Sequence, residues 1–279
     1  MRLIDVEHLG RPHVIGCWQV DGALIDPGPE SSLETLVAAL GDEPPQAIVL
    51  THIHLDHAGG TGALVRRWPD LEVYVHERGA RHLADPSKLL DSASRLYGEH
   101  MERLWGEIVP VPEENLRPLS GGETVLGMRV AYTPGHASHH VCYLHEESGT
   151  AFVGDVAAVR IPPSDLIVPP TPPPDIDIES WEESTRLVES WDPERLALTH
   201  FGSIDDGPAA HLAKVRERLR EEAGLARDLP EEDYERHHRE RVADSADPET
   251  AVELIQCVPP QYQWRGLNRY WDKQKARSN

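Results

Sequence analysis

The sequence is poor in cysteine, and this scarcity argues against a fold held together by disulfides. Its 279 residues include three cysteines, Cys17, Cys142 and Cys257, which lie far apart and are odd in number. Small secreted domains depend on dense, paired cysteines, whereas cytoplasmic thiols stay reduced. We therefore expect a cytoplasmic protein whose cysteines are small buried side chains.

Long apolar runs and basic residues are also scarce. No stretch approaches the roughly twenty apolar residues of a membrane span, and the N-terminus has no basic segment followed by an apolar one. The 27 Lys and Arg residues are outnumbered by 48 Asp and Glu residues, which gives a formal charge of −21. Such a surface repels a nucleic-acid backbone. The expected partner is a small molecule, with no membrane and no nucleic acid, and a homodimer stays open.

Histidine is well represented, and it is concentrated in residues 51–57. This stretch follows the apolar run 47–50, which predicts a buried strand, and it precedes residues 63–68, which predict a helix. Imidazole and carboxylate groups bind zinc, iron and manganese, and zinc is favoured where histidine dominates. The stretch supplies four potential metal ligands, which are His52, His54, Asp56 and His57.

Three further candidate ligands, His136, Asp155 and His200, each follow a short apolar run. Ligands at the ends of several strands are what a rigid sheet edge supplies to an active site. Seven donors exceed the four that a closed zinc site takes, but they suffice for two ions that share a carboxylate. His136 follows a Pro-Gly turn, and His139 and His140 are its rivals.

These ordered motifs resemble those of the metallo-β-lactamase superfamily. Residues 52–57 match its His-x-His-x-Asp-His signature, and the three later ligands follow in the family's order. The turn at residues 24–28 looks like the family's second-strand turn, in which Asp26 supports the ligands. The resemblance covers about residues 1–205. It implies an α/β fold, a four-layer αββα sandwich of metallo-β-lactamase type.

The resemblance also implies the metal assignments and the reaction. His52, His54 and His136 would hold a first ion, and Asp155 would bridge to a second. Both ions would be divalent, zinc in the first instance, with iron or manganese as alternatives. The implied reaction is hydrolysis of a small acyl substrate (ester, thioester or lactone) by a metal-bridging hydroxide. The second ion would be held by Asp56, His57 and His200, with Asp56 also orienting the hydroxide and passing on its proton.

Several relatives of this superfamily stay open as alternatives. Residues 136–143 look like the corresponding segment of glyoxalase II, but the Gly-Cys-Gly-Arg/Lys stretch of that enzyme is replaced by residues 156–160. Lactonases use the same metal set. A mononuclear-iron sulfur dioxygenase of the same fold and a phosphodiesterase are further alternatives. The flavin-coupled diiron oxidoreductases are disfavoured because they have Glu where this chain has His54.

Two segments are expected to border the substrate site. The first is an insertion at about residues 85–118, whose apolar stripe predicts a helix over 89–105. It either packs on the core or places Tyr97, His100 and Trp105 over the metals. The second is the Pro-rich loop 161–174, which cannot form a helix or a central strand.

Two polar residues near the bridging aspartate also receive provisional roles. His140 is expected to support the metal ligands or to lie at the surface. Arg160 is the one cation just past Asp155, so it either meets an anionic group of the substrate or forms a surface ion pair. With so few nearby cations, the sequence favours a small and weakly charged substrate.

The chain is expected to divide near residue 205. Residues 1–205 form the predicted catalytic domain, including the insertion and the Pro-rich loop. Residues 206–279 are highly charged, with apolar residues at helical spacing and an aromatic segment near the end. They predict a helical C-terminal extension that packs on the core or on a partner chain.

Overall fold

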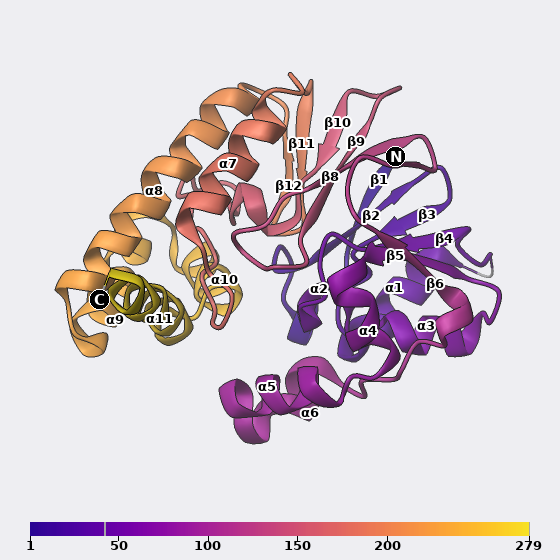
Figure 1. The fold of residues 1–279 in the computed structure, drawn as a ribbon, viewed down its shortest axis with the longest axis horizontal. Coiled ribbons are helices and arrows are strands. Elements are labelled where there is room, and N and C mark those ends of the chain that lie inside the picture. Colours follow the sequence, from indigo (N-terminus) through magenta and orange to yellow (C-terminus); the bar gives the residue numbers. More distant parts are fainter. Residues whose placement is uncertain (42, 279) are drawn as a thin grey trace.

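Two six-stranded β-sheets form the centre of the protein (Figure 1). The computed structural model describes residues 1–41 and 43–278. The first sheet has the order β1 (Arg2–Asp5), β2 (Gly16–Val20), β3 (Ala23–Ile25), β4 (Ala47–Val49), β5 (Glu72–His76) and β6 (Leu116–Leu119). The second has the order β12 (Gly202–Ile204), β11 (Arg195–Leu198), β10 (Thr150–Phe152), β9 (Val141–His145), β8 (Met128–Tyr132) and β7 (Thr124–Val125).

Helices cover the outer face of each sheet. Side chains from α1 (Leu33–Leu40), α3 (Thr61–Arg67) and α4 (Glu77–Ala84) pack with the first sheet in one apolar cluster. Those from α7 (Ile178–Glu189) and α8 (Pro208–Asp228) pack with the second sheet. A third cluster lies between the sheets. The arrangement is the four-layer αββα sandwich that the motifs predicted.

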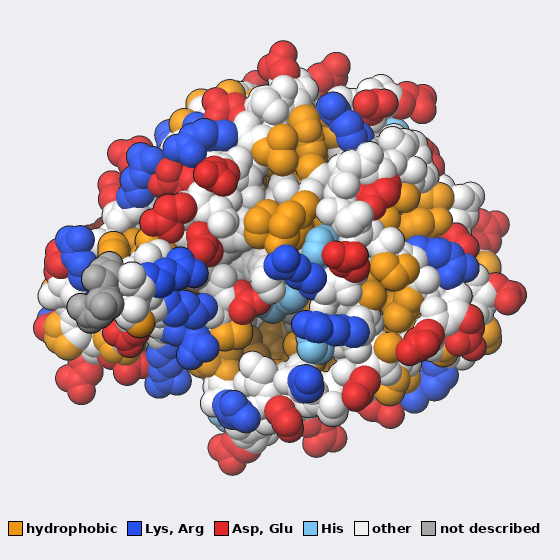
Figure 2. Space-filling view, in the orientation of Figure 1, with side chains coloured by type: hydrophobic (Ala, Val, Ile, Leu, Met, Phe, Trp, Pro, Cys, Tyr) orange, Lys and Arg blue, Asp and Glu red, His pale blue; other side chains and the backbone are white. Residues whose placement is uncertain are grey.

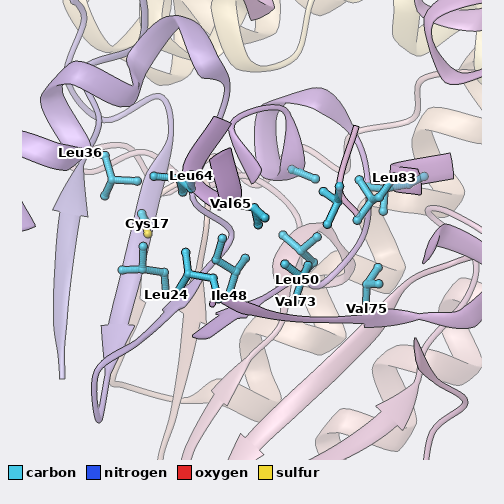
Figure 3. Close-up of a cluster of buried hydrophobic side chains, with 14 of the residues drawn as sticks. Cys17, Leu24, Leu36, Ile48, Leu50, Leu64, Val65, Val73, Val75 and Leu83 are labelled. Carbon is cyan, nitrogen blue, oxygen red and sulfur yellow. The ribbon is translucent and has the colours of Figure 1, made fainter. Parts of the chain in front are cut away.

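The alternation of side chains along each strand explains the layers. Cys17 and Leu24 point towards the helices (Figure 3), whereas Trp18 and Ile25 point towards the second sheet. Successive side chains of a strand face opposite sides, so a strand buried on both faces must be apolar throughout. This is why the run at β4 carries no polar residue.

The strand register brings the later metal ligands to one edge of the second sheet. Strands β10 and β11 are parallel, and Phe152 pairs with Ala197. Asp155 and His200 each lie three residues beyond this pair, so they leave the sheet at the same end. The loop that carries His136 joins β8 to β9 at that end as well.

The insertion differs from the continuous helix that its apolar stripe predicted. It forms α5 (Ser87–Tyr97) and α6 (Met101–Trp105), joined by a 3-10 turn over Gly98–His100. Gly98 has φ +54°, a left-handed conformation that ends α5 and that glycine adopts without steric cost. The two short helices therefore fold back beneath the first sheet's helices (Figure 1) instead of extending as a rod.

The C-terminal residues form four helices that pack against one another: α8, α9 (Glu231–Ser245), α10 (Pro248–Cys257) and α11 (Pro260–Ser278). Helix α11 also holds the Pro-rich loop, because the Thr171 amide donates to Gln263 Oε1 at 2.5 Å. A Cβ on Gly266 would lie 1.9 Å from the Thr171 carbonyl oxygen, so the contact requires glycine. No helix of the described residues combines the length and apolar character needed to cross a membrane.

Candidate metal centre and its cavity

The histidine-rich motif forms the turn between β4 and the short helix α2 (Leu55–Ala58). His52 and His54 lie in the extended part of this turn, and Asp56 and His57 lie in the helix. Alternate residues of an extended segment point the same way, whereas a helix redirects those that follow. The motif therefore contributes ligands to two separate groups, as its spacing predicted.

The first group contains three histidines and one aspartate. One donor atom from each lies within 4.8 Å of all the others. The Nδ1 atom of His54 lies 3.0 Å from His52 Nε2 and 2.9 Å from His136 Nε2. Three imidazole nitrogens and a carboxylate oxygen that converge in this way suit zinc or iron. The members are His52, His54, His136 and Asp155.

The second group consists of Asp56, His57 and His200. The Nε2 atoms of the two histidines are 3.3 Å apart. Asp56 Oδ2 lies 3.5 Å from His200 Nε2 and 3.8 Å from His57 Nε2. Two nitrogens and one oxygen leave room for a shared ligand and a water on an ion bound there.

Asp155 lies between the two groups, and each of its two oxygens contacts histidines of a different group. Its Oδ2 is 3.2 Å from His136 Nε2. Its Oδ1 is 3.2 Å from His57 Nε2 and 3.5 Å from His200 Nε2. One carboxylate thus contacts both histidine sets, which is the position that a bridging ligand occupies.

Hydrogen bonds on the far side of the rings fix which nitrogen faces the centre. His136 Nδ1 donates to the Pro170 carbonyl at 2.9 Å, and His200 Nδ1 donates to the Val14 carbonyl at 2.6 Å. A carbonyl only accepts, so the proton sits on Nδ1 and the Nε2 lone pair faces the ligand group. Such outer contacts are typical of histidines that bind metals.

Asp26 organises the outer contacts around His57. This fully buried carboxylate accepts from His57 Nδ1 at 2.8 Å. It also accepts from the Thr51 amide at 2.8 Å, the Thr51 hydroxyl at 2.7 Å and the Thr199 hydroxyl at 3.0 Å. The residue therefore connects the ends of β3, β4 and β11, the supporting position that the turn at residues 24–28 suggested.

Burial and neighbouring charges set the protonation of the ligands. Burial lowers the pKa of His52 well below its usual range, and it lowers the pKa of His136 to about 4 despite the opposing effect of Asp155. Both rings are neutral at physiological pH and offer lone pairs. Burial also opposes the charging of His57, but Asp155 and Asp56 raise its pKa to about 10. An ion in the second group would therefore displace a proton.

The two rivals of His136 take other positions. The ring of His140 stacks on His52 with centroids 5.0 Å apart, and its Nδ1 lies 2.9 Å from Thr133 Oγ1. His139 accepts from the Ile53 amide at 3.4 Å and lines the adjoining cavity. Neither belongs to a ligand group within the described residues. His140 thus buttresses a ligand, one of the two roles expected for it.

The ligand groups open into a cavity of about 1130 Å³. Figure 2 shows a hollow on this face with histidine side chains visible inside it. The helical insertion and the Pro-rich loop both contribute residues to the wall of this cavity, and α11 completes it. Tyr97 of α5 meets Tyr262 of α11 edge to face, with centroids 5.3 Å apart. The helical insertion and the C-terminal helices therefore meet beside the candidate metal centre.

Four residues were expected to shape this cavity, and the structure separates them. Tyr97 and Trp105 line it. His100 is exposed, and it is not among the described residues that do so. Of the two alternatives for the insertion, the one that places His100 over the metals is wrong for this residue, which lies exposed at the end of the 3-10 turn Gly98–His100. Arg160 is also absent from the described lining and pairs with Asp165 at 2.7 Å, so it forms the surface ion pair.

Several lining residues escaped the sequence analysis. His8 stacks on Trp105 with centroids 5.6 Å apart, and its ring is buried. Cys257, at the end of α10, lines the cavity and donates to the Val14 carbonyl at 3.3 Å. Both come from parts of the chain without a motif, so only the tertiary fold places them here.

We expect Trp105→Ala to change substrate preference while leaving metal content unchanged. The ring is 8% exposed, packs with Leu55 and Ala93, and forms part of the cavity wall. Its removal should shift the ratio of kcat/KM between a bulky and a small acyl substrate by about tenfold. It should also cost about 3–5 kcal/mol of unfolding free energy. Trp68→Ala, which trims a core residue away from the cavity, is the control. An unchanged ratio in both variants would assign Trp105 to the core alone.

Comparison with known proteins agrees with this geometry. A sequence model of the Metallo-beta-lactamase superfamily matches residues 21–200, from β3 to the last ligand. This match covers more than half of the chain. The chain belongs to the metallo-beta-lactamase superfamily, and it carries a His/Asp metal-binding cluster at the ends of its strands.

Two individual relatives share 30% and 29% sequence identity with part of this chain. A metallo-beta-lactamase fold-containing protein of Sulfurisphaera tokodaii is 30% identical over 164 residues, which cover 56% of this chain and 60% of that protein. A hydroxyacylglutathione hydrolase of Legionella pneumophila is 29% identical over 136 residues, which cover 47% of this chain and 41% of the hydrolase. The matched regions thus span less than two thirds of either relative.

Solved structures show the same fold. The crystal structure of an archaeal superfamily protein from Sulfolobus tokodaii has a TM-score of 0.73 and 23% identity, and the match covers 95% of this chain and 97% of that one. A second protein, solved in a di-iron-bound form, has a TM-score of 0.53 and 29% identity over 70% of this chain and 92% of its own. The C-terminal helices fall within the first of these matches.

Proposed function

We propose that this protein is a dinuclear metal-dependent hydrolase of acyl substrates, namely esters, thioesters or lactones. The observation that carries the proposal is the position of Asp155, whose two oxygens contact separate ligand groups. The first ion would be held by His52, His54 and His136. The second would be held by Asp56, His57 and His200. Two such ions lower the pKa of a shared water and polarise the carbonyl that it attacks.

The chain's own residues supply the rest of the chemistry. Asp56 lines the cavity and remains ionised, because His57 and His200 outweigh the effect of burial and hold its pKa below the usual range. Its Oδ2 can accept the proton of the attacking water and pass it to the leaving group. Cys257 also lines the cavity, but burial raises the pKa of its thiol. A thiolate nucleophile is therefore disfavoured.

The names of two relatives support an acyl substrate. One is the hydroxyacylglutathione hydrolase of Legionella pneumophila, and another is an atrochrysone carboxyl ACP thioesterase of Aspergillus fumigatus, 29% identical over 112 residues. The di-iron form of the second structural relative supports a two-ion site and leaves iron as well as zinc as the metal.

The test is a substrate panel with the metals removed and restored. We expect hydrolysis of at least one ester, thioester or lactone, loss of this activity after chelation, and recovery with zinc, iron or manganese. The protein should hold about two ions per chain. One tightly bound iron with oxygen uptake on a persulfide would establish the sulfur dioxygenase instead. A phosphodiester cleaved faster than every acyl substrate would establish a phosphodiesterase.

A further inference from the structure

The cavity wall is basic, although the protein as a whole carries a formal charge of −21. Six Lys or Arg residues line it, against three carboxylates, two of which are candidate metal ligands. Figure 2 shows Lys and Arg side chains gathered around the hollow in which histidines are visible. The cations are Arg78, Arg81, Lys88, Arg95, Arg103 and Arg265. The carboxylates are Asp56, Asp155 and Asp175.

Most of these cations have no acidic partner. Among the described residues, only Arg265 of the six forms an ion pair, with Glu231 at 2.8 Å. Arg78 instead donates to the Tyr132 hydroxyl at 3.0 Å, and Arg81 donates to His82 Nε2 at 3.3 Å. Elsewhere on this acidic surface, cations such as Arg66 and Arg236 pair with carboxylates at 3.0 and 2.6 Å. Unpaired like charges around one cavity repel each other, and a bound anion relieves this repulsion.

The cations share one cavity with members of both ligand groups. Arg81 donates to His82 Nε2 at 3.3 Å, and Lys88 lines the same wall. His139 lines the cavity as well, and its ring centroid lies 5.7 Å from that of His54 in the first group.

Arg103 of α6 lines the cavity together with His8 and Trp105, whose rings stack with centroids 5.6 Å apart. Asp56 and His200 of the second group line the same cavity. A substrate whose carbonyl reaches the ligand groups would therefore pass between basic side chains of α4, α5 and α6.

We propose that the substrate is an acyl thioester whose thiol portion carries phosphate groups. The inference rests on the proposed hydrolase function and names its substrate class. The carbonyl must reach the ligand groups, and we assign the cations on the outer wall to contacts with the part that leaves. Five unpaired cations call for more charge than one carboxylate supplies, and arginine binds phosphate through paired hydrogen bonds. The cavity of about 1130 Å³ also exceeds what a small acyl group fills.

This inference differs from the expectation of a small, weakly charged substrate. That expectation rested on the acidic surface, on the missing Gly-Cys-Gly-Arg/Lys stretch and on Arg160 as the one cation beside Asp155. Arg160 is absent from the described lining. The cations that do line the cavity come from α4, α5, α6 and α11. Five of them lie within residues 78–103, and the fold brings Arg265 to the same cavity.

The experiment compares butyryl thioesters of three thiols: coenzyme A with its phosphates, glutathione with its carboxylates, and uncharged N-acetylcysteamine. The test variant is Arg81→Gln/Lys88→Gln. The matched control is Arg66→Gln/Arg236→Gln, which removes the same charge from exposed ion pairs outside the cavity. We expect the test variant to lower kcat/KM for the coenzyme A thioester about tenfold, through KM. The uncharged thioester and the control variant should be unaffected.

A binding measurement separates this inference from the proposed reaction. Adenosine 3′,5′-bisphosphate carries phosphates but no thiol, and its affinity can be measured by calorimetry in holoprotein. We expect it to bind the wild type and the control alike, and to bind the test variant about tenfold more weakly. The same binding result with no hydrolysis of any ester, thioester or lactone would refute the proposed reaction, whereas the phosphate site would stand. Hydrolysis of esters or lactones without hydrolysis of any thioester would overturn the thioester assignment. Equal binding by all three proteins, or a preference for the glutathione thioester, would overturn the inference.

Discussion

Replacement of Asp155 by Ala is expected to lower kcat on the best acyl substrate by about a thousandfold and to reduce metal content below one ion per chain. The reason is that its Oδ2 contacts His136 of the first group, while its Oδ1 contacts His57 and His200 of the second. Removing this carboxylate would take one ligand from each of the two proposed ions. It also takes away the negative charge that holds the two groups together.

Two further variants make this prediction specific. His200→Ala removes a ligand of the second group alone, so it should leave about one ion bound. Asp165→Ala removes a carboxylate that is 87% exposed and pairs with Arg160, so it should change neither metal content nor kcat. Elemental analysis and steady-state kinetics on the same preparations would check all three. Retention of both ions by the Asp155→Ala protein would refute the bridging role.

Replacement of Asp26 by Ala is expected to cost about 3–5 kcal/mol of unfolding free energy and to weaken metal binding by about 10–100-fold. The carboxylate is fully buried and accepts four hydrogen bonds, from His57, Thr199 and twice from Thr51. Its loss leaves four buried hydrogen-bond donors without an acceptor, at the point where the ends of three strands meet. It also frees the ring of His57 to rotate away from the second ion.

Denaturant unfolding and metal titration would separate these two effects. Asp70→Ala, at an exposed position beyond α3, is the matched control and should leave both quantities unchanged. The Asp26→Asn protein keeps one side-chain oxygen that accepts hydrogen bonds but loses the negative charge. Higher stability than that of Asp26→Ala, with binding of the second ion still weakened, would fit this difference. An Asp26→Ala protein with wild-type stability and metal affinity would contradict the supporting role.

The sequence was most informative where chemistry depends on local spacing. The ligand motif at residues 51–57, the apolar runs before His136, Asp155 and His200, and the turn at Asp26 all follow from short-range patterns. Strand ends at one sheet edge lie close together, which agrees with the seven candidate ligands; the fold class and the order of the ligands followed from the resemblance of these patterns to the metallo-β-lactamase superfamily. The structure brings all seven into two groups.

The cavity wall was less predictable, for physical reasons. Apolar periodicity over residues 89–105 cannot reveal that Gly98 adopts a left-handed conformation and turns His100 outward. Sequence proximity to Asp155 suggested Arg160, but the cations that line the cavity come from residues 78–103 and from Arg265, which are distant from Asp155 in the sequence. The contact between Tyr97 and Tyr262 joins residues from the insertion and the last helix. Side chains gathered by tertiary packing carry no local pattern.

The most direct test of the dinuclear site is anomalous diffraction from crystals of the protein loaded with zinc or iron. The geometry predicts two anomalous peaks about 3.5–4 Å apart, with the Asp155 carboxylate between them. The first should be bound by His52, His54 and His136, and the second by Asp56, His57 and His200. A single peak at the first group, with the second group empty at saturating metal, would contradict the two-ion account.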